Sequence, residues 1–283
     1  MASRTDSDPG SDHVVITRHL EAVESAALID LHAAASADVR KVMGLRLESM
    51  GGAHASVAER GANIVINRVI GLGIDEPATI EQLNAIRAFY RRAGIERYFV
   101  QASPVAKPIP LTVLLEQNGL IRDRGWMKFA RGAEPLGEPV TDFSIREVGP
   151  EHAKEFGQIV GRAFDLEDSG GQLCACLVGR PGWHVFMSFD GDRPAGTGAL
   201  YVKDGVGWTD WGATDPAFRR RGSQSALLAR RINKAIELGC NLIGTCTGEA
   251  VPGDEQHSYG NIKRAGFTEI GVRDNYSPTG RPG

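Results

Sequence analysis

Apolar residues recur with two different periods in the second half of the chain. They follow helical spacing over residues 150–164 and 223–238, whereas they alternate with polar residues over 183–189. Asp190-Gly191 and Asp204-Gly205 favour tight antiparallel turns between strand-like segments. Further strands are expected at 143–148, 196–203, 206–214, 241–247 and 267–274, and further helices at 172–177 and 254–264, the last with Asp254 as its N-cap. The predicted order is β-α-α-β-β-β-α-β-α-β.

The first half repeats the later part of that order in a weaker form. A helix opens with the capping box Thr79-x-x-Gln82 and ends at Gly94. A short helix in each half ends at a glycine, Gly119 and Gly266. Strands are expected at 62–70, 97–101 and 125–131, and the short helix of this half at 110–117. This similarity predicts two related domains in tandem.

Composition along the chain indicates where these domains meet. Gly132–Thr141 is rich in proline, glycine and glutamate, which is typical of a linker. The polar segment Met1–Asp12 predicts a disordered lead. We therefore expect domains at 13–131 and 142–283. The fold class is α/β (α+β), with a mixed, mostly antiparallel sheet flanked by helices in each domain.

Bulk charge and cysteine spacing exclude several function classes. The formal net charge is −3 in a chain of 283 residues, which disfavours nucleic acid and anionic membrane as partners. No apolar run approaches the ~18 residues of a membrane span. The four cysteines form no C-x-x-C pair and have no histidines at zinc-finger spacing, so we expect no metal site. Reduced thiols predict a cytoplasmic protein.

One turn carries the strongest chemical signal. Arg219, Arg220, Arg221 and Gly222 lie between a predicted strand and the helix that begins at Ser223. Free backbone N–H groups at such a turn, together with the helix dipole, favour an anion such as a pyrophosphate. Gly71-Leu72-Gly73 in the first half is too sparse for a dinucleotide site and is followed by two acids, so we interpret it as structural.

The second half, over residues 142–277, resembles the Gcn5-related N-acetyltransferase (GNAT) superfamily. The resemblance rests on Thr214-Asp215-Pro216, on Arg219-x-x-Gly222-x-Gln224 and on Arg264-Ala265-Gly266-Phe267. The first half resembles a degenerate copy without the arginine turn. Gln224 stands where the family prefers glycine or alanine, so its side chain must point away from the pyrophosphate or contact it.

Membership in this family implies acetyl-CoA as the acyl donor. The amides at Arg221–Ser225 would then hold the pyrophosphate, and the edge of the preceding strand would hold the pantetheine arm. The implied cofactor-binding residues are Gly212, Ala213, Thr214, Arg219, Arg220, Arg221, Gly222, Ser223, Gln224, Ser225 and Asn261. Ile262 stands where many members carry a tyrosine that protonates the leaving thiolate, which puts the usual acid in question.

Candidate catalytic groups lie around the same turn. Asp210 precedes it on the strand between Trp208 and Trp211 and is the first candidate for a general base; a solvent-facing strand aspartate that pairs with a neighbour is the alternative. Glu249 is a second candidate base. Tyr259 is the candidate acid, with Ser258 and His257 as further options. Without a bulge, the two tryptophans point to opposite faces of the strand.

The predicted function is transfer of an acetyl group from acetyl-CoA to an amine by direct attack in a ternary complex. The acceptor, a small-molecule or peptide amine, would lie in the cleft between the halves. A non-catalytic acyl-CoA binding or sensing protein is the alternative. The sequence leaves the identity of the acceptor and the oligomeric state open.

Overall fold

The computed structural model describes residues 9–253 and 256–279. The first half contains helices α1 (Pro9–Ala34), α2 (Ala37–Met43), α3 (Ile80–Arg92) and α4 (Leu111–Gln117), and strands β1 (Arg46–Met50), β2 (Ala53–Val57), β3 (Arg68–Ile70), β4 (Phe99–Ala102) and β5 (Ile121–Arg131). The second half contains strands β6 (Ser144–Glu147), β7 (Trp183–Asp190), β8 (Arg193–Lys203), β9 (Val206–Thr214), β10 (Leu242–Gly248) and β11 (Thr268–Ser277). Its helices are α5 (Ala153–Ala163), α6 (Asp168–Ala175), α7 (Ser223–Glu237) and α8 (His257–Arg264), with single 3-10 turns at Pro150–His152 and Pro216–Phe218.

The predicted order of the second half is confirmed element by element, and the fold class is confirmed as mixed α/β with a largely antiparallel sheet. The helix α7 forms where predicted because its apolar residues share one face, including Leu227, Leu228 and Ile232, all buried. The Asp-Gly turns join β7 to β8 and β8 to β9. Asp254, the predicted N-cap of α8, lies outside the described residues.

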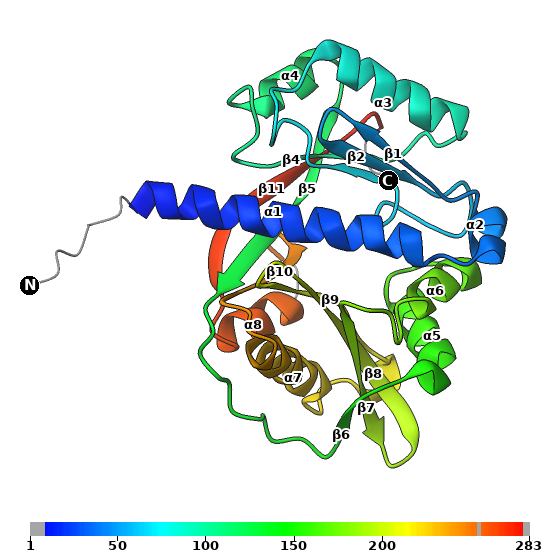
Figure 1. Ribbon diagram of the computed structural model, residues 1–283, viewed down its shortest axis with the longest axis vertical. Coiled ribbons are helices and arrows are strands. Elements are labelled where there is room, and N and C mark those ends of the chain that lie inside the picture. Colours follow the sequence, from blue (N-terminus) through cyan, green and yellow to red (C-terminus); the bar gives the residue numbers. More distant parts are fainter. Residues whose placement is uncertain (1–8, 254–255, 280–283) are drawn as a thin grey trace, which may run out of the picture.

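The strands form one continuous sheet, in the order β1-β2-β3-β4-β11-β5-β10-β9-β8-β7-β6. Figure 1 shows the strands of the two halves meeting at the centre of the molecule, with α3 and α4 over the first half and α7 and α8 over the second. Residues 132–143, around the predicted linker, have no regular secondary structure.

Each half contributes a strand to the other at this junction. The last strand of the first half, β5, lies between β10 and β11 and is antiparallel to both. The last strand of the second half, β11, lies between β4 and β5 and is antiparallel to both. Neither half therefore has a complete sheet without a strand from the other half.

The beginning of the chain differs from the prediction. Residues 9–12, predicted to be disordered, begin the long helix α1, and residues 1–8 lie outside the described part. The helix packs across β9, β8, β5 and β11, as Figure 1 shows. Its buried face carries Glu21 and Glu24 beside leucine and valine residues, and these acids interrupt the apolar pattern that marks a helix. The strand expected at 62–70 is also shorter, because regular pairing begins only at Arg68.

Candidate functional site

Two adjoining cavities lie where β9, β10, α7 and α8 meet. The larger, of about 770 Å³, follows the arginine turn and α8. The smaller, of about 310 Å³, extends toward the junction of the two halves. Both are lined by Gly212, Gln224, Thr247, Gly248, Ser258 and Asn261. A ligand in the larger cavity could therefore meet a second ligand in the smaller one.

The N-terminus of α7 opens into the larger cavity. Gly222 adopts φ 87°, a left-handed conformation that glycine tolerates, and the first helical bond runs from Ala226 N–H to Gly222 C=O. The N–H groups of Ser223, Gln224 and Ser225 thus have no acceptor within the helix. Together with the dipole of the helix they form a site suited to an anion.

The three arginines of the turn have different surroundings. Arg219 and Arg220 line the larger cavity. The guanidinium of Arg221 instead donates two hydrogen bonds of 3.0 Å to Asp190 and lies 4.5 Å from the ring centre of Phe143. The ion pair with Asp190 raises the pKa of Arg221. The side chain of Arg221 therefore does not line the larger cavity, where it was predicted to bind the cofactor, because it pairs with Asp190 at the end of β7.

The side chain of Gln224 points away from the helix N-terminus. Its Nε2 donates to Ser258 Oγ at 3.1 Å, and its Oε1 accepts from Asn261 Nδ2. Arg264, another residue at the larger cavity, donates in turn to Asn261. These contacts join α7 to α8 at the boundary of the two cavities. The hydroxyl of Ser223 is buried against Ser188 at 2.7 Å, which leaves its amide for a ligand.

The edge of β9 separates from β10 beside this site. The two strands pair in parallel only over Val206–Trp208 and Leu242–Gly244. Beyond that point the pairing of β9 with β8 shifts register, and Trp211 adopts φ 49°. This bulge places Trp208 and Trp211 in one hydrophobic cluster, both buried and both lining the smaller cavity, so the opposite faces expected without a bulge do not apply. Gly212, Ala213 and Thr214 follow along the larger cavity.

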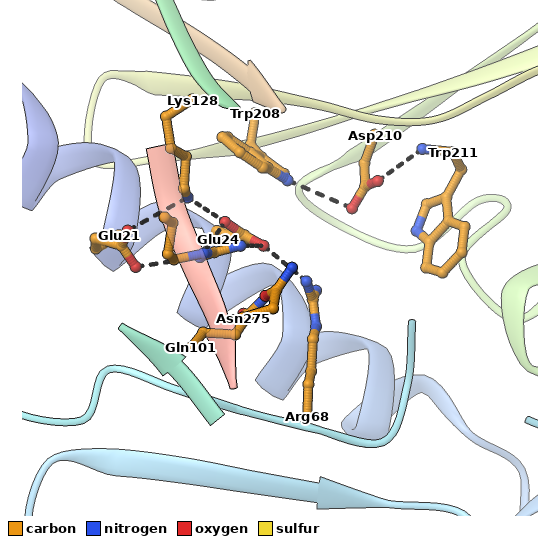
Figure 2. A network of polar contacts seen from close by, with 10 residues as sticks. Glu21, Glu24, Arg68, Gln101, Lys128, Trp208, Asp210, Trp211 and Asn275 are labelled. Carbon is orange, nitrogen blue, oxygen red and sulfur yellow. Dashed lines mark hydrogen bonds and ion pairs between the residues drawn. The ribbon is translucent and has the colours of Figure 1, made fainter. Parts of the chain in front are cut away.

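Asp210 lies at the start of the bulge and lines the smaller cavity. Its Oδ1 accepts a hydrogen bond of 2.8 Å from the amide of Trp211, and its Oδ2 accepts one of 3.4 Å from Trp208 Nε1, as Figure 2 shows. Burial raises the pKa of Asp210 above its ordinary value, and the nearby Arg68 opposes this shift only in part. A carboxylate in this position can accept a proton more readily than one in water.

The structure does not bring Glu249 to either cavity. Its carboxylate accepts from Arg122 at 2.9 Å and from the amide of Gly125 at 2.7 Å. Although burial acts in the opposite direction, these donors hold the pKa of Glu249 below its ordinary value. A carboxylate in that state is a poor base, so the role predicted for Glu249 does not fit its surroundings.

Tyr259 lines the larger cavity but its hydroxyl is already engaged. The ring packs edge-on against Phe129 at 4.9 Å between centres. Burial and a hydrogen bond to Glu269 raise the pKa of Tyr259 to about 12. Ser258, the neighbouring option, has its hydroxyl at the boundary of the two cavities and is better placed to meet ligands in both. Ile262 is buried and lines the smaller cavity.

The first half supplies part of the smaller cavity; the sequence predicted a cleft between the halves but did not indicate which residues of the first half line it. Glu24 of α1, Arg68 of β3 and Trp126 of β5 all line it. The guanidinium of Arg68 lies 5.1 Å from the ring centre of Trp126. Arg124, also on β5, lines the larger cavity. No local motif marks these residues: the exchanged strand β5 brings Trp126 and Arg124 to the site, and the packing of α1 and β3 brings Glu24 and Arg68.

A buried ion network holds this wall of the cavity, as Figure 2 shows. Glu24 accepts from Arg68 at 2.9 Å and from Arg273 at 2.8 Å, and Lys128 also donates to it. Burial alone would raise the pKa of Glu24, but the three cations outweigh it and hold that pKa well below its ordinary value. Glu24 is therefore an ionised, fully engaged partner rather than a base for a ligand.

Arg231 of α7 closes the cavity on another side. It is buried, and its guanidinium donates to the backbone carbonyls of Leu227 and Asp210, both at 3.1 Å, and of Ala199 at 3.4 Å. Burial lowers the pKa of Arg231 to about 10, and the nearby Asp210 opposes this shift. A side chain on Gly198 would collide with this guanidinium, which explains the glycine there.

Comparison with known protein families gives one match, within the second half. Residues 150–267 match the model of the acetyltransferase (GNAT) family. A search of curated protein sequences finds no match to this chain. Within the described residues, no helix is long and apolar enough to cross a membrane.

Solved structures resemble the whole chain. A GCN5-related N-acetyltransferase from Kribbella flavida is 16% identical, with a TM-score of 0.65 over 93% of this chain and 96% of the other. A tandem GNAT protein from the clavulanic acid biosynthesis pathway is 14% identical, with a TM-score of 0.58 over 97% of each chain. A third, from Sphaerobacter thermophilus, is 15% identical, with a TM-score of 0.57 over 82% of this chain and 78% of the other. At these identities the likeness shows a shared fold.

Proposed function

Because residues 150–267 match the GNAT family model and the chain shares the fold of a tandem GNAT protein, we propose that this protein transfers an acetyl group from acetyl-CoA to an amine. The larger cavity would hold the donor and the smaller one the acceptor. The free amides at the N-terminus of α7 carry this proposal, since they fit a pyrophosphate.

The residues of the chain fit both ends of such a donor. Arg219 and Arg220 add charge at the anion site, and Arg124 and Arg264 lie along the same cavity. The unpaired edge of β9 at Gly212, Ala213 and Thr214 would form hydrogen bonds with an extended amide-containing arm, through backbone N–H donors and C=O acceptors. Asn261 would brace this arm through its contact with Gln224. When bound, the thioester supplies the activated acyl group.

Transfer requires that the amine be neutral and lose a proton as the new C–N bond forms and the C–S bond breaks. We assign the acceptance of that proton to Asp210, whose carboxylate lines the acceptor cavity. Ser258 lies at the boundary of the cavities, where a hydroxyl can stabilise the leaving sulfur. Holding both reactants in adjoining cavities supplies the remaining advantage through proximity. The cytoplasmic location stays a prediction.

Calorimetry with coenzyme A tests the donor site. Arg219→Gln and Arg220→Gln should each weaken binding by about tenfold, because a charged hydrogen bond to phosphate is lost. Arg221→Gln is the matched control and should change the affinity little, because its guanidinium is paired with Asp190. An equal loss of affinity for coenzyme A in all three variants would contradict this division of roles.

Release of free thiol from acetyl-CoA in the presence of pooled amines tests the reaction. Amine-dependent release is expected. Binding of coenzyme A without any release would support the non-catalytic alternative, an acyl-CoA binding or sensing protein. The buried Ile262 and the engaged hydroxyl of Tyr259 are the features that favour that alternative.

A further inference from the structure

The smaller cavity has properties that narrow the class of acceptor. Resting on the proposed function, we propose that the acceptor is a small apolar amino acid, with its amine at Asp210 and its carboxylate at Arg231 and Trp211. The charges and hydrogen-bond donors that line this cavity, together with its small volume, suit such a molecule.

Arg231 is a buried cation without a carboxylate partner. Its hydrogen bonds use Nε and Nη1 and end on three backbone carbonyls. Among the residues that the structure describes, no carboxylate forms an ion pair with it. A side chain built on Gly212 would lie 3.3 Å from Nη2, so this nitrogen lies beside a residue that lines both cavities. A buried charge of this kind is costly unless a ligand compensates it.

Two other donors of the cavity wall have no partner. The indole Nε1 of Trp211 and the Nε of Arg68 are buried without a hydrogen bond in the structure. In Figure 2 the indole nitrogen of Trp211 is turned toward the space between Asp210 and Arg68. Buried donors in proteins are nearly always satisfied, so their presence in a ligand cavity points to an acceptor group on the ligand.

Of the two acidic residues that line the cavity, one is paired with cations and the other is not. Glu24 is engaged by Arg68, Lys128 and Arg273. Among the described residues, the carboxylate of Asp210 has hydrogen bonds only to Trp208 and Trp211 and no cation in ion-pair contact. Asp210 can therefore meet an amine, while Arg231 can meet an anion. A simple alkylamine would pair with Asp210 and leave Arg231 without a counter-charge.

Part of the remaining wall is apolar and the space is small. Trp126, Phe164, Trp208 and Leu228 line the cavity. A volume of about 310 Å³ suits a single small molecule. An apolar side chain on the acceptor would fill this space, which leaves the two charged groups of the amino acid at Asp210 and Arg231.

Matched ligand pairs test this inference on the full chain. Calorimetry in the presence of coenzyme A compares L-leucine with isopentylamine, and L-phenylalanine with phenethylamine, each pair differing by the carboxylate. The amino acid of a pair should bind at least about tenfold more tightly, as expected for hydrogen bonds to a charged group. Equal or tighter binding of the amines, or no binding of either member of both pairs, would overturn the inference.

Variants locate the carboxylate. Trp211→Phe keeps the ring and removes the donor, and Arg231→Gln removes the charge; each should reduce the preference for the amino acid severalfold. Arg230→Gln, an exposed neighbour on α7, should retain it. If Arg231→Gln fails to fold, Trp211→Phe decides alone. A preference that persists in Trp211→Phe and in any folded Arg231→Gln overturns the assignment.

Transfer assays separate this inference from the proposed function. Acetylation of decarboxylated amines only would leave the proposed function intact and overturn the inference. Absence of both coenzyme A binding and thiol release would overturn the proposed function and the inference with it.

Discussion

At the scale of single residues, the site depends on one carboxylate in an unusual place. Asp210 precedes the bulge of β9, where Trp211 adopts a left-handed conformation. Because the bulge turns both neighbouring tryptophans into the same cluster, the carboxylate is enclosed by indole rings. Burial is the largest cause of its raised pKa, and the nearby Glu24 adds to the shift.

Asp210→Asn should lower turnover by about 10²–10⁴-fold and leave the affinity for coenzyme A unchanged, because an amide cannot accept the proton of the amine. In the native protein, turnover should fall on the acid side of the pH profile at a pH above the ordinary range of aspartate pKa values. Since the folded-state pKa of Asp210 is raised, its contribution to stability falls as pH rises through that value, and the variant should lose this dependence. Steady-state kinetics and urea unfolding across pH measure both effects.

Asp204→Asn, in the exposed turn between β8 and β9, is the matched control and should behave as the native protein. Unchanged turnover in Asp210→Asn would remove this residue from the reaction.

At the scale of elements, α1 connects the halves through polar contacts on its buried face. Glu24 reaches Arg68 of β3, Lys128 of β5 and Arg273 of β11. His32, near the end of the helix, shares a hydrogen bond of 2.7 Å with Ser56 of β2. The contacts between α1 and the sheet therefore include the ionisable side chains of Glu24 and His32, so their strength depends on protonation.

Acidification should loosen α1 through His32. Burial lowers the pKa of His32 to about 4, with Arg40 adding to the shift. A lowered folded-state pKa means that stability is lost as pH falls from the unfolded value toward the folded one. Between pH 7 and pH 5 the loss from this group should be about 2 kcal/mol. Urea unfolding at the two pH values measures it.

In His32→Gln, the difference in the free energy of unfolding between pH 7 and pH 5 should be smaller by about that amount. His19→Gln, on an exposed position of the same helix, should keep the native difference. A native pH dependence in His32→Gln would show that another group is responsible.

At the scale of the whole molecule, the exchange of β5 and β11 makes the two halves interdependent. The sheet passes without interruption from β1 to β6, and the segment 132–143 runs outside it, as Figure 1 shows. A chain of residues 142–283 alone would expose the edges of β10 and β11 that β5 covers. Exposed edges of this kind promote aggregation.

Fragment complementation tests this interdependence. Residues 142–283 expressed alone should be insoluble or unable to bind coenzyme A, and co-expression with residues 1–141 should restore a soluble complex. Cleavage at a site introduced beside the exposed Val140 should leave the two fragments associated. A folded, coenzyme A-binding fragment 142–283 would contradict the prediction. Gel filtration and calorimetry provide the measurements.

The local elements of the second half could be predicted from the sequence, because each depends on neighbours along the chain. The spacing of Leu227, Leu228 and Ile232 specifies a helix, and the Asp-Gly pairs specify turns. The arginine turn and Gly222 mark the helix N-terminus for the same reason. The pattern failed on α1, where Glu21 and Glu24 are buried by partners far away in the sequence.

By itself, the sequence determined the order of elements in the second half and the position of the helix N-terminus where we propose that an anion binds, since backbone propensities and apolar periodicity act over a few residues. Only the tertiary structure decided which side chains surround the smaller cavity. Trp126 reaches it on the exchanged strand β5 and Arg68 on β3, Arg221 is paired with Asp190, and Glu249 is held by Arg122. Such contacts depend on strand pairing and ion pairing between distant segments, which no local pattern records.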